Sequence, residues 1–179
     1  MPYDPSPQPA GRPAAPAARF SFRIGHGYDL HRLQPAGVLM LGGLAVARDL
    51  SPVAHSDGDV VLHALVDALL GAMGWGDIGD HFPNTDARWK DAPSRVFVEE
   101  VYAKVTAAGY RVGNVDVTVL AERPKLKAFK RPMAELVAEM VGVGPEQVNV
   151  KAGTNEGCDA LGRGEAIAAH AVVLLVAAD

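Results

Sequence analysis

The chain has 179 residues, of which 49% are hydrophobic and 21% are charged, and its formal net charge at pH 7 is -4. These values suit one soluble globular domain with a sizeable core, and they argue against a general nucleic-acid-binding protein, which would need a basic face. No apolar run is long enough to span a bilayer, and the single cysteine, Cys158, cannot form an internal disulfide, so we expect a protein of the reducing cytoplasm.

The first 19 residues are rich in proline and alanine and show no apolar period. Such a segment cannot bury enough surface to offset its ordering entropy. It also lacks the apolar stretch of a secretory signal, and a transit peptide would carry more serine and fewer acidic residues. We therefore expect a disordered tail over residues 1–19 and a single catalytic domain over residues 20–179.

The domain begins with a stretch in which Phe20, Phe22 and Ile24 alternate with other residues, which predicts a strand. Gly25 and Gly27 follow directly in the same stretch. Because glycine has no side chain, the two positions allow unusual backbone or the close approach of another segment.

The same predicted strand ends with Asp29 and His31, which are two positions apart. Residues at this spacing in an extended segment project from the same face. The pair is therefore a natural two-ligand arm for a divalent metal, although an Asp-x-His spacing also occurs by chance at the end of a strand.

A helix is predicted from Asp57 or Asp59, either of which suits its N-cap, to just before Gly74. Within it, Asp59, His63 and Asp67 are spaced by four residues and share one face. A histidine between two carboxylates on a core-forming helix is typical of a metal ligand whose neighbours orient it. The alternative for this helix taken alone is a polar stripe that faces water.

The remaining elements follow from the same periodicities and from their glycine and proline boundaries. They are strands over 38–41, 115–121, 147–152 and 165–178, helices over 94–108 and 132–141, and loops over 75–86 and 153–164. Ser94 is the expected cap of the second helix, and the alanine-rich last strand could also be read as a helix. The order of elements predicts an α+β two-layer sandwich of the ferredoxin-like kind, with helices on one face of a mixed or antiparallel four-to-five-stranded sheet.

Three of these positions form a set with metal-binding chemistry, namely Asp29, His31 and His63. Three nitrogen and oxygen ligands with an open fourth position are the pattern of a zinc site that contacts substrate. In the second glycine-rich loop, Glu156 could hold Mg²⁺, which prefers carboxylate and phosphate oxygens, and Thr154 beside it could donate to a phosphate. The sequence therefore indicates phosphoryl chemistry in which metal ions act as clamps.

Five segments of the chain also resemble a known enzyme family. They read Arg-Ile-Gly-His-Gly-Tyr-Asp-Leu-His over 23–31, Ala-His-Ser-Asp-Gly-Asp-Val over 54–60, Gly-Asp-Ile-Gly-Asp-His-Phe-Pro-Asn-Thr-Asp over 76–86, Gly-Asn-Val-Asp-Val-Thr over 113–118 and Gly-Arg-Gly-Glu over 162–165. In order and spacing they resemble the 2-C-methyl-D-erythritol 2,4-cyclodiphosphate synthases of the non-mevalonate isoprenoid pathway. The resemblance extends from about residue 23 to residue 177.

This resemblance implies a reaction and an assembly. A synthase of this family converts 4-diphosphocytidyl-2-C-methyl-D-erythritol 2-phosphate to the cyclic diphosphate and releases CMP, which makes it a phosphorus–oxygen lyase. The family also implies a homotrimer whose active sites lie between subunits. Zn²⁺ or another divalent metal would bind Asp29, His31 and His63, and Glu156 would bind Mg²⁺ or Mn²⁺ between the two phosphates of the substrate.

The resemblance also implies which residues meet the substrate. His55 would stabilise the transition state, and Thr154 would steady the leaving phosphate. The implied substrate contacts are Asp29, His31, His55, Ser56, Asp77, Gly79, Phe82, Pro83, Asn84, Thr85, Asp86, Ala121, Pro124, Lys125, Lys127, Gly153, Thr154, Asn155, Glu156, Ala160 and Arg163.

The second loop departs from the family pattern at several positions. Gly153 and Asn155 stand where the family has hydroxyl side chains, and Ala160 stands where it has phenylalanine. In the family, that phenylalanine lines a central cavity of the trimer where an isoprenoid diphosphate can bind near Arg163. We expect weaker retention of such a ligand here.

Two other functions are compatible with the same residues. One is a zinc-dependent phosphohydrolase that uses water as the nucleophile. The other is a non-catalytic trimer that binds a nucleotide or an isoprenoid. The product of CMP release, cyclic or linear, distinguishes the first alternative from the synthase, and a turnover assay with and without Mg²⁺ tests the second.

Overall fold

The computed structural model describes residues 20–178, so the expected tail over residues 1–19 lies outside the described residues. In chain order the elements are β1 (Phe22–Pro35), β2 (Leu39–Leu41), β3 (Leu44–Ala47), β4 (Leu50–Pro52), α1 (Val60–Met73), α2 (Ile78–His81), the 3-10 turn η1 (Ala87–Trp89), α3 (Ser94–Ala107), β5 (Tyr110–Leu120), α4 (Lys130–Met140), the 3-10 turn η2 (Pro145–Gln147), β6 (Val148–Gly153), α5 (Asp159–Gly162) and β7 (Ala166–Ala177). Within this described part, no helix is both long enough and apolar enough to cross a bilayer.

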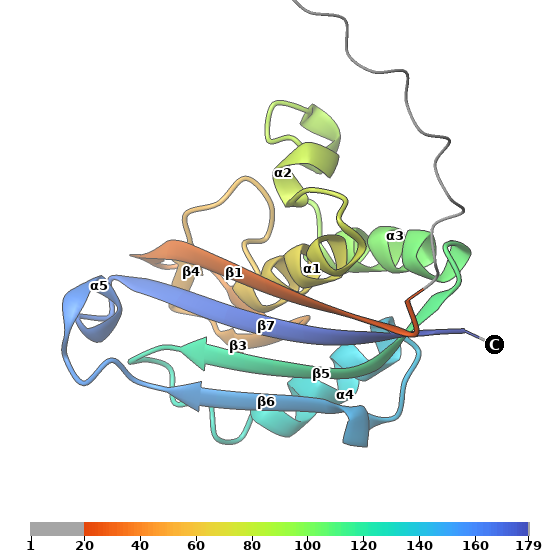
Figure 1. The fold of residues 1–179 in the computed structure, drawn as a ribbon. Coiled ribbons are helices and arrows are strands. Elements are labelled where there is room, and N and C mark those ends of the chain that lie inside the picture. The colour runs from red at the N-terminus through yellow and green to blue at the C-terminus, as the bar shows by residue number, and fades with distance from the viewer. Residues whose placement is uncertain (1–19, 179) are drawn as a thin grey trace, which may run out of the picture.

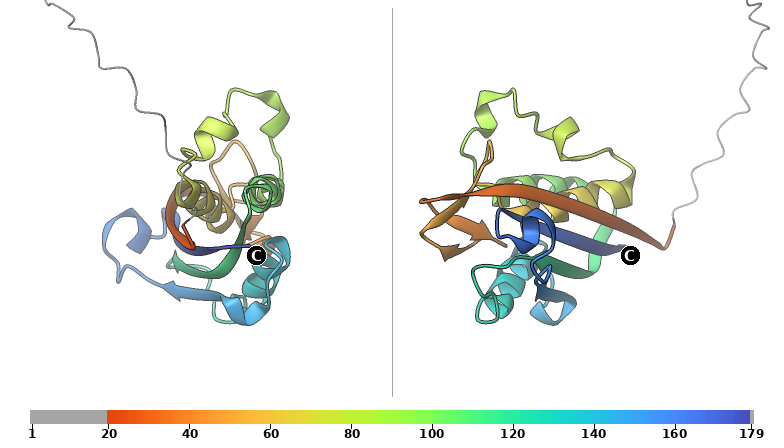
Figure 2. Two further views of the ribbon diagram at one scale, coloured as in Figure 1. Left: turned by 45° about the vertical axis from the view of Figure 1, so that its right-hand side comes forward. Right: turned by 90° about the vertical axis from the view of Figure 1, so that its left-hand side faces the viewer.

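Five of the strands form one mixed sheet in the order β4-β1-β7-β5-β6, and β2 pairs only with β3 (Figure 1). β5 and β6 are parallel, whereas the other neighbours in the sheet are antiparallel. Helices α1, α3 and α4 bury their apolar stripes with the sheet in one core (Figure 2). The predicted α+β class and the mixed five-stranded sheet are therefore confirmed.

The contact between α1 and β1 depends on two glycines. A Cβ atom added at Gly25 would lie 1.8 Å from the carbonyl oxygen of Ala68, and one added at Gly27 would lie 1.9 Å from that of Ala64. No other residue fits at such distances, so the helix lies directly on the strand backbone. This close approach is what places His63 of α1 over the end of β1.

Helix α1 begins and ends as the sequence predicted. The carboxylate of Asp59 caps it by accepting the N–H groups of Val61 and Leu62, and Gly74 ends it with φ at 71°. The same carboxylate accepts the N–H groups of Gly42 and Gly43 at 2.9 and 2.7 Å. One buried side chain therefore fixes the start of α1 against the turn between β2 and β3.

The face of the sheet opposite the helices is open and largely apolar along β1 and β7. Phe22 is 59% exposed and Ile24 is 65% exposed, so the alternating residues that predicted the strand point away from the core. Tyr28, Leu30 and Val172 are also exposed on this face. The odd-numbered residues of β1, which include the metal-ligand candidates, face the helices instead.

Several predicted boundaries were wrong. The segment 38–41 shortens to β2 and forms a hairpin with the unexpected β3, and α2 and α5 lie inside the two expected loops. Ser94 is not the cap of α3: the N-cap position is Pro93, which makes no side-chain cap hydrogen bond, and Ser94 is the first helical residue, with its hydroxyl bonded to Asp57. The last element is a strand, and its small alanine side chains suit its position between β1 and β5.

Candidate active site

A cavity of about 450 Å³ opens where the end of β1 meets the start of α1 and the segment around α2. It is lined by Asp29, His31, Ala54, His55, Ser56, His63, Ile78, Gly79, Phe82, Pro83, Asn84, Thr85, Trp89 and Phe97. Ten of these fourteen positions are among the predicted metal or substrate residues. The fold therefore brings these ten predicted residues, from three separate segments of the chain, together around a single cavity.

Three side chains converge at the floor of this cavity. The Asp29 Oδ2 atom lies 2.9 Å from His63 Nδ1 and 3.2 Å from His31 Nε2. The two histidine nitrogens are 3.3 Å apart, and all three ligand atoms lie within 4.8 Å of one another. The spatial prediction for Asp29, His31 and His63 as one cluster is thus confirmed.

The donor set fits a small divalent metal. Zinc in proteins takes imidazole nitrogens and carboxylate oxygens at about 2.0–2.1 Å, and a tetrahedral arrangement then separates neighbouring ligands by about 3.3 Å. The observed separations of 2.9 to 3.3 Å are close to that value. Only small side-chain shifts would be needed for these three groups to hold zinc, and the cavity leaves a fourth position open to a ligand.

The two imidazoles of the cluster have different electrostatic surroundings. Burial lowers the pKa of His31, and the charge of Asp29 only partly opposes this effect. Burial acts on His63 in the same sense, but the hydrogen bond and charge of Asp29, together with Asp59 and Asp57, raise the pKa of His63 overall. In the metal-free protein, His63 is therefore the imidazole that holds a proton more strongly.

The far side of the His63 ring meets two hydroxyl groups that sequence reasoning did not assign to it. His63 Nε2 lies 2.9 Å from Ser94 Oγ and 3.1 Å from Ser56 Oγ. Ser94 in turn donates its hydroxyl and its N–H to the two carboxylate oxygens of Asp57. The sequence predicts Ser94 as a helix cap, and nothing local in the sequence links it to His63.

The two acids expected to flank His63 do not bond to its ring. Asp59 serves as the α1 cap, which was one of its predicted alternatives. Asp67 accepts the N–H of Ile78 at 2.8 Å and so fixes the start of α2 against α1. Burial is the main reason that the pKa of the Asp67 carboxyl is raised.

An aromatic group forms one wall of the cavity. Phe82 packs against Trp89 with ring centroids 5.1 Å apart and against Phe97 at 4.7 Å, and Trp89 meets Phe97 at 5.6 Å. Only Phe82 of these three was predicted. Trp89 follows the expected loop and Phe97 lies in the predicted helix over 94–108, so the sequence carries no signal for their place at the cavity.

A second cavity, of about 280 Å³, lies between the segment after β5 and the end of β6. Its lining is Ala121, Pro124, Lys125, Leu126, Lys127, Lys130, Ala152, Gly153 and Thr154. The two segments are joined by the N–H of Ala121 to the carbonyl of Gly153 at 3.0 Å and by the N–H of Asn155 to Glu122 Oε1 at 3.1 Å. This cavity gathers six of the predicted substrate contacts, and it shares no lining residue with the first cavity.

Six predicted residues line neither of these cavities. They are Asp77, Asp86, Asn155, Glu156, Ala160 and Arg163. Asp77 caps α2 and Asp86 pairs with Arg88, whose hydrogen bond lowers the pKa of the Asp86 carboxyl. Glu156 accepts the Thr154 hydroxyl at 3.2 Å, and Arg163 pairs with Glu165 at 2.9 Å.

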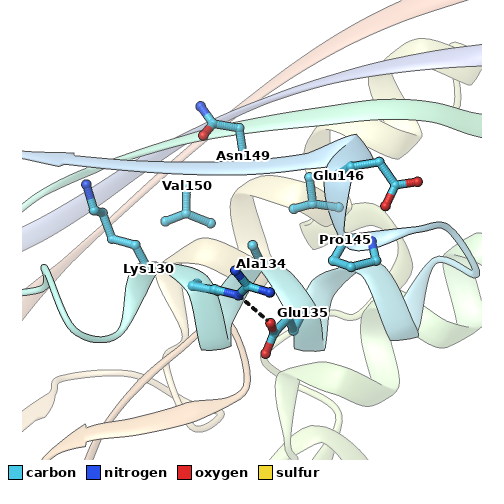
Figure 3. A pocket seen from close by; sticks show the side chains of 9 residues that line it. Lys130, Ala134, Glu135, Pro145, Glu146, Asn149 and Val150 are labelled. Atoms are coloured by element: carbon cyan, nitrogen blue, oxygen red, sulfur yellow. Dashed lines mark hydrogen bonds and ion pairs between the residues drawn. The ribbon is translucent and has the colours of Figure 1, made fainter.

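A third cavity, of about 560 Å³, lies between α4 and the edge strand β6 (Figure 3). Lys130, Ala134, Glu135, Pro145 and Val150 are among its lining residues, and Glu135 pairs with Arg131 across one helical turn (Figure 3). None of the predicted site residues lies in it.

Comparison with known proteins gives consistent results. The profile of the YgbB family matches residues 22–176. The chain is 53% identical over 155 residues to the 2-C-methyl-D-erythritol 2,4-cyclodiphosphate synthase of Pseudomonas aeruginosa, with 87% of this chain and 99% of the relative covered. It is 47% identical over 169 residues to the chloroplastic synthase of Catharanthus roseus, with 94% of this chain and 72% of the relative covered. Among solved structures, the CDP complex of Plasmodium falciparum IspF matches with a TM-score of 0.80 at 30% identity and covers 90% of this chain and 100% of that chain.

Proposed function

We infer the function of this chain from its family, because it belongs to the YgbB family of 2-C-methyl-D-erythritol 2,4-cyclodiphosphate synthases. It converts 4-diphosphocytidyl-2-C-methyl-D-erythritol 2-phosphate to 2-C-methyl-D-erythritol 2,4-cyclodiphosphate in the non-mevalonate isoprenoid pathway. An oxygen of the 2-phosphate forms a bond to the β-phosphorus, and the bond from that phosphorus to the bridging oxygen breaks. CMP leaves with the bridging oxygen, so the reaction needs no nucleophile from the protein.

The observation that carries the site assignment is the convergence of Asp29, His31 and His63 in one cavity. We propose that these three residues bind zinc or another divalent metal there. When bound, the metal supplies positive charge that neutralises and orients the phosphate to be attacked. The chain's own contribution is a carboxylate and two imidazoles whose positions are fixed before the substrate arrives.

His55 and Ser56 are proposed to contact the same phosphate, the one to be attacked. Both line the cavity beside the metal ligands, and His55 is exposed to its opening. A donor from His55 would stabilise the charge that develops on the phosphate oxygens in the transition state. Gly79 and the segment 82–85 line the neighbouring wall and are proposed to hold the methylerythritol part, with Asp77 and Asp86 next to them in the chain.

The second cavity is proposed to hold the cytidine end of the substrate. Ala121 and Pro124 supply apolar contacts, and Lys125 and Lys127 supply charge for the phosphates. Thr154 lies at the same cavity and would donate to the leaving phosphate. Glu156, Gly153, Asn155, Ala160 and Arg163 complete the proposed set, with Glu156 as the carboxylate for Mg²⁺ or Mn²⁺ between the two phosphates.

The separation of the two cavities supports an active site that is shared between subunits. In one chain the metal cavity and the cytidine cavity have no lining residue in common. The open apolar face of β1 and β7 is a surface that assembly would cover. With the trimer that the family resemblance implies, these features support our proposal of a homotrimer of ferredoxin-like subunits, in which the cytidine cavity of one subunit faces the metal cavity of its neighbour.

The compartment is a further part of the proposal. The Pseudomonas relative is a bacterial enzyme, whereas the Catharanthus relative is described as chloroplastic. The one cysteine, Cys158, is free and exposed, which suits a reducing cytoplasm. We propose a cytoplasmic enzyme, and fractionation of the source cells tests this.

The function is tested by following the phosphorus of the substrate by ³¹P NMR with zinc and Mg²⁺ present. The expected result is one cyclic diphosphate for each CMP released. A linear product would instead identify a phosphohydrolase. Binding of the substrate with no release of CMP would identify a non-catalytic binding protein.

A further inference from the structure

We propose that Ser94, held by Asp57, is the positioning residue that orients the His63 ring so that its Nδ1 atom faces the metal position. This inference rests on the proposed metal site and adds to it two residues that belong to neither substrate cavity. The supporting observation is that the two ring nitrogens of His63 have different partners. Nδ1 lies 2.9 Å from Asp29 Oδ2, and Nε2 lies 2.9 Å from Ser94 Oγ.

The direction of each hydrogen bond follows from the partners of Ser94. Its hydroxyl donates to one oxygen of Asp57, and its N–H donates to the other oxygen at 3.0 Å. A serine hydroxyl has a single proton, so its oxygen can only accept from His63 once that proton is committed to the carboxylate. His63 Nε2 must then carry a proton, which leaves Nδ1 as the nitrogen available to a metal.

Ser56 also lies near His63 Nε2, at 3.1 Å, but its surroundings differ. Ser56 lines the cavity and is half-buried, so substrate and water compete for its hydroxyl. Ser94 is fully buried at 0% exposure and lines none of the three cavities described above. The acceptor that keeps its place through the reaction is therefore Ser94, and Ser56 is left to meet the phosphate.

Ser94 and Asp57 are themselves held in place by the backbone around them. The segment that carries Asp57 is joined to the residues before α3 by two backbone hydrogen bonds, from Asp57 N–H to Ala92 at 3.2 Å and from Asp91 N–H to His55 at 2.9 Å. The first turn of α3 then carries Ser94. A bonded pair held by two elements orients the ring more strictly than a single flexible side chain would.

The test compares Ser94→Ala with Ser56→Ala, because each change removes one hydroxyl that lies near the same nitrogen. Zinc affinity is measured by competition with a chelator. We expect Ser94→Ala to bind zinc about 10–100-fold more weakly, and Ser56→Ala to bind it within about threefold of the unmodified protein. The melting temperature of each metal-free variant shows whether the fold persists.

A second readout does not depend on activity. In protein labelled with ¹⁵N at histidine, the His63 Nε2–H proton should exchange slowly with water, both with and without zinc. Slow exchange should persist in Ser56→Ala and be lost in Ser94→Ala. Should Ser94→Ala fail to fold, Asp57→Asn carries the test, because an NH₂ group then replaces one of the two oxygens that accept from Ser94, and this change should also weaken zinc binding.

The inference is overturned if Ser94→Ala or Asp57→Asn keeps both the zinc affinity and the slow exchange of the unmodified protein. Failure of this inference can be distinguished from failure of the proposed metal site. If the unmodified protein takes up no zinc at the cluster, the metal site itself is wrong, and the exchange of the Nε2–H proton still decides whether Ser94 orients His63.

Discussion

The two cavities of this chain are built in contrasting ways. At the metal cavity, His63 is 8% exposed and is bonded on both ring nitrogens, and the helix that carries it lies directly on the backbone of β1. At the cytidine cavity, Gly153 is exposed and an added Cβ there would have no heavy atom within 4 Å beyond its chain neighbours, and Glu156, three residues further along the chain and outside the cavity lining, is exposed too. The fold of a single chain therefore fixes the side chains of the metal cavity, whereas the cytidine cavity is left open for a ligand or a neighbouring subunit.

The largest effect should come from removing a ligand on the fixed side. For His63→Ala we expect zinc affinity to fall by more than about 100-fold, because loss of a partner of a metal ligand alone costs 10–100-fold. CMP release should fall by at least about 100-fold as well, since the phosphate loses the charge that orients it. Chelator competition and a CMP assay measure the two quantities. CMP release near the rate of the unmodified protein, in a variant that binds no zinc, would contradict this prediction.

The second prediction concerns stability and uses one glycine from each side. Gly27→Ala would place a methyl group 1.9 Å from the backbone oxygen of Ala64, so α1 must move away from β1. We expect a loss of about 3 kcal/mol in the free energy of unfolding. Gly153→Ala has free space around it and should change this free energy by less than about 0.5 kcal/mol. Urea unfolding measures both, and equal losses would contradict the contrast.

The third prediction separates binding from chemistry on the open side. Lys125 lines the cytidine cavity and is proposed to meet the phosphates of the substrate. Lys125→Ala should raise KM about tenfold, which matches the loss of one hydrogen bond to a charged group, and it should leave kcat and the melting temperature nearly unchanged. Steady-state kinetics checks this. A fall in kcat with an unchanged KM would place Lys125 in the chemical step instead.

The smallest effect is expected at an ion pair that belongs to neither cavity. The hydrogen bond from Lys151 lowers the pKa of the Asp116 carboxyl, and the two charged atoms are 2.5 Å apart on the exposed face of the sheet. A depressed pKa in the folded state gives stability that is present above the unfolded pKa and is lost as the pH falls. Asp116→Asn should therefore cost about 0.5 kcal/mol at pH 7, because both groups are largely exposed, and the cost should shrink below about pH 4. Urea unfolding at several pH values measures it, and a cost that grows on acidification would show that the pair is not its source.

The elements that the sequence predicted are those whose periodic pattern continues over many residues. The predicted alternation over 115–121 lies almost wholly within β5, and the predicted helical spacing covers α1, so burial imposes a pattern on both. The start of β5 at Tyr110 was missed, because a register shift between Val112 and Asn114 interrupts the alternation there. Strands β2 and β4 have three residues each, which is too short for any period. Their positions depend on contacts such as the one from Asp59 to the Gly42–Gly43 turn, which no local signal announces.

The candidate site divides in the same way. Asp29 and His31 could be paired from their spacing alone, because a strand directs both to one face. Their meeting with His63 depends on the close contact of α1 with the glycines of β1, which the sequence allowed but did not require. Ser94 was placed wrongly, since its capping signal is local whereas its actual partner, Asp57, lies 37 residues away.

The central claim is that Asp29, His31 and His63 together hold the metal that orients the substrate phosphate. The most direct test is a crystal structure of the zinc-loaded protein with data collected at the zinc absorption edge. The account predicts an anomalous peak about 2.0–2.1 Å from Asp29 Oδ2, His31 Nε2 and His63 Nδ1. Zinc bound elsewhere in catalytically active crystals, with these three atoms free of metal, would contradict it.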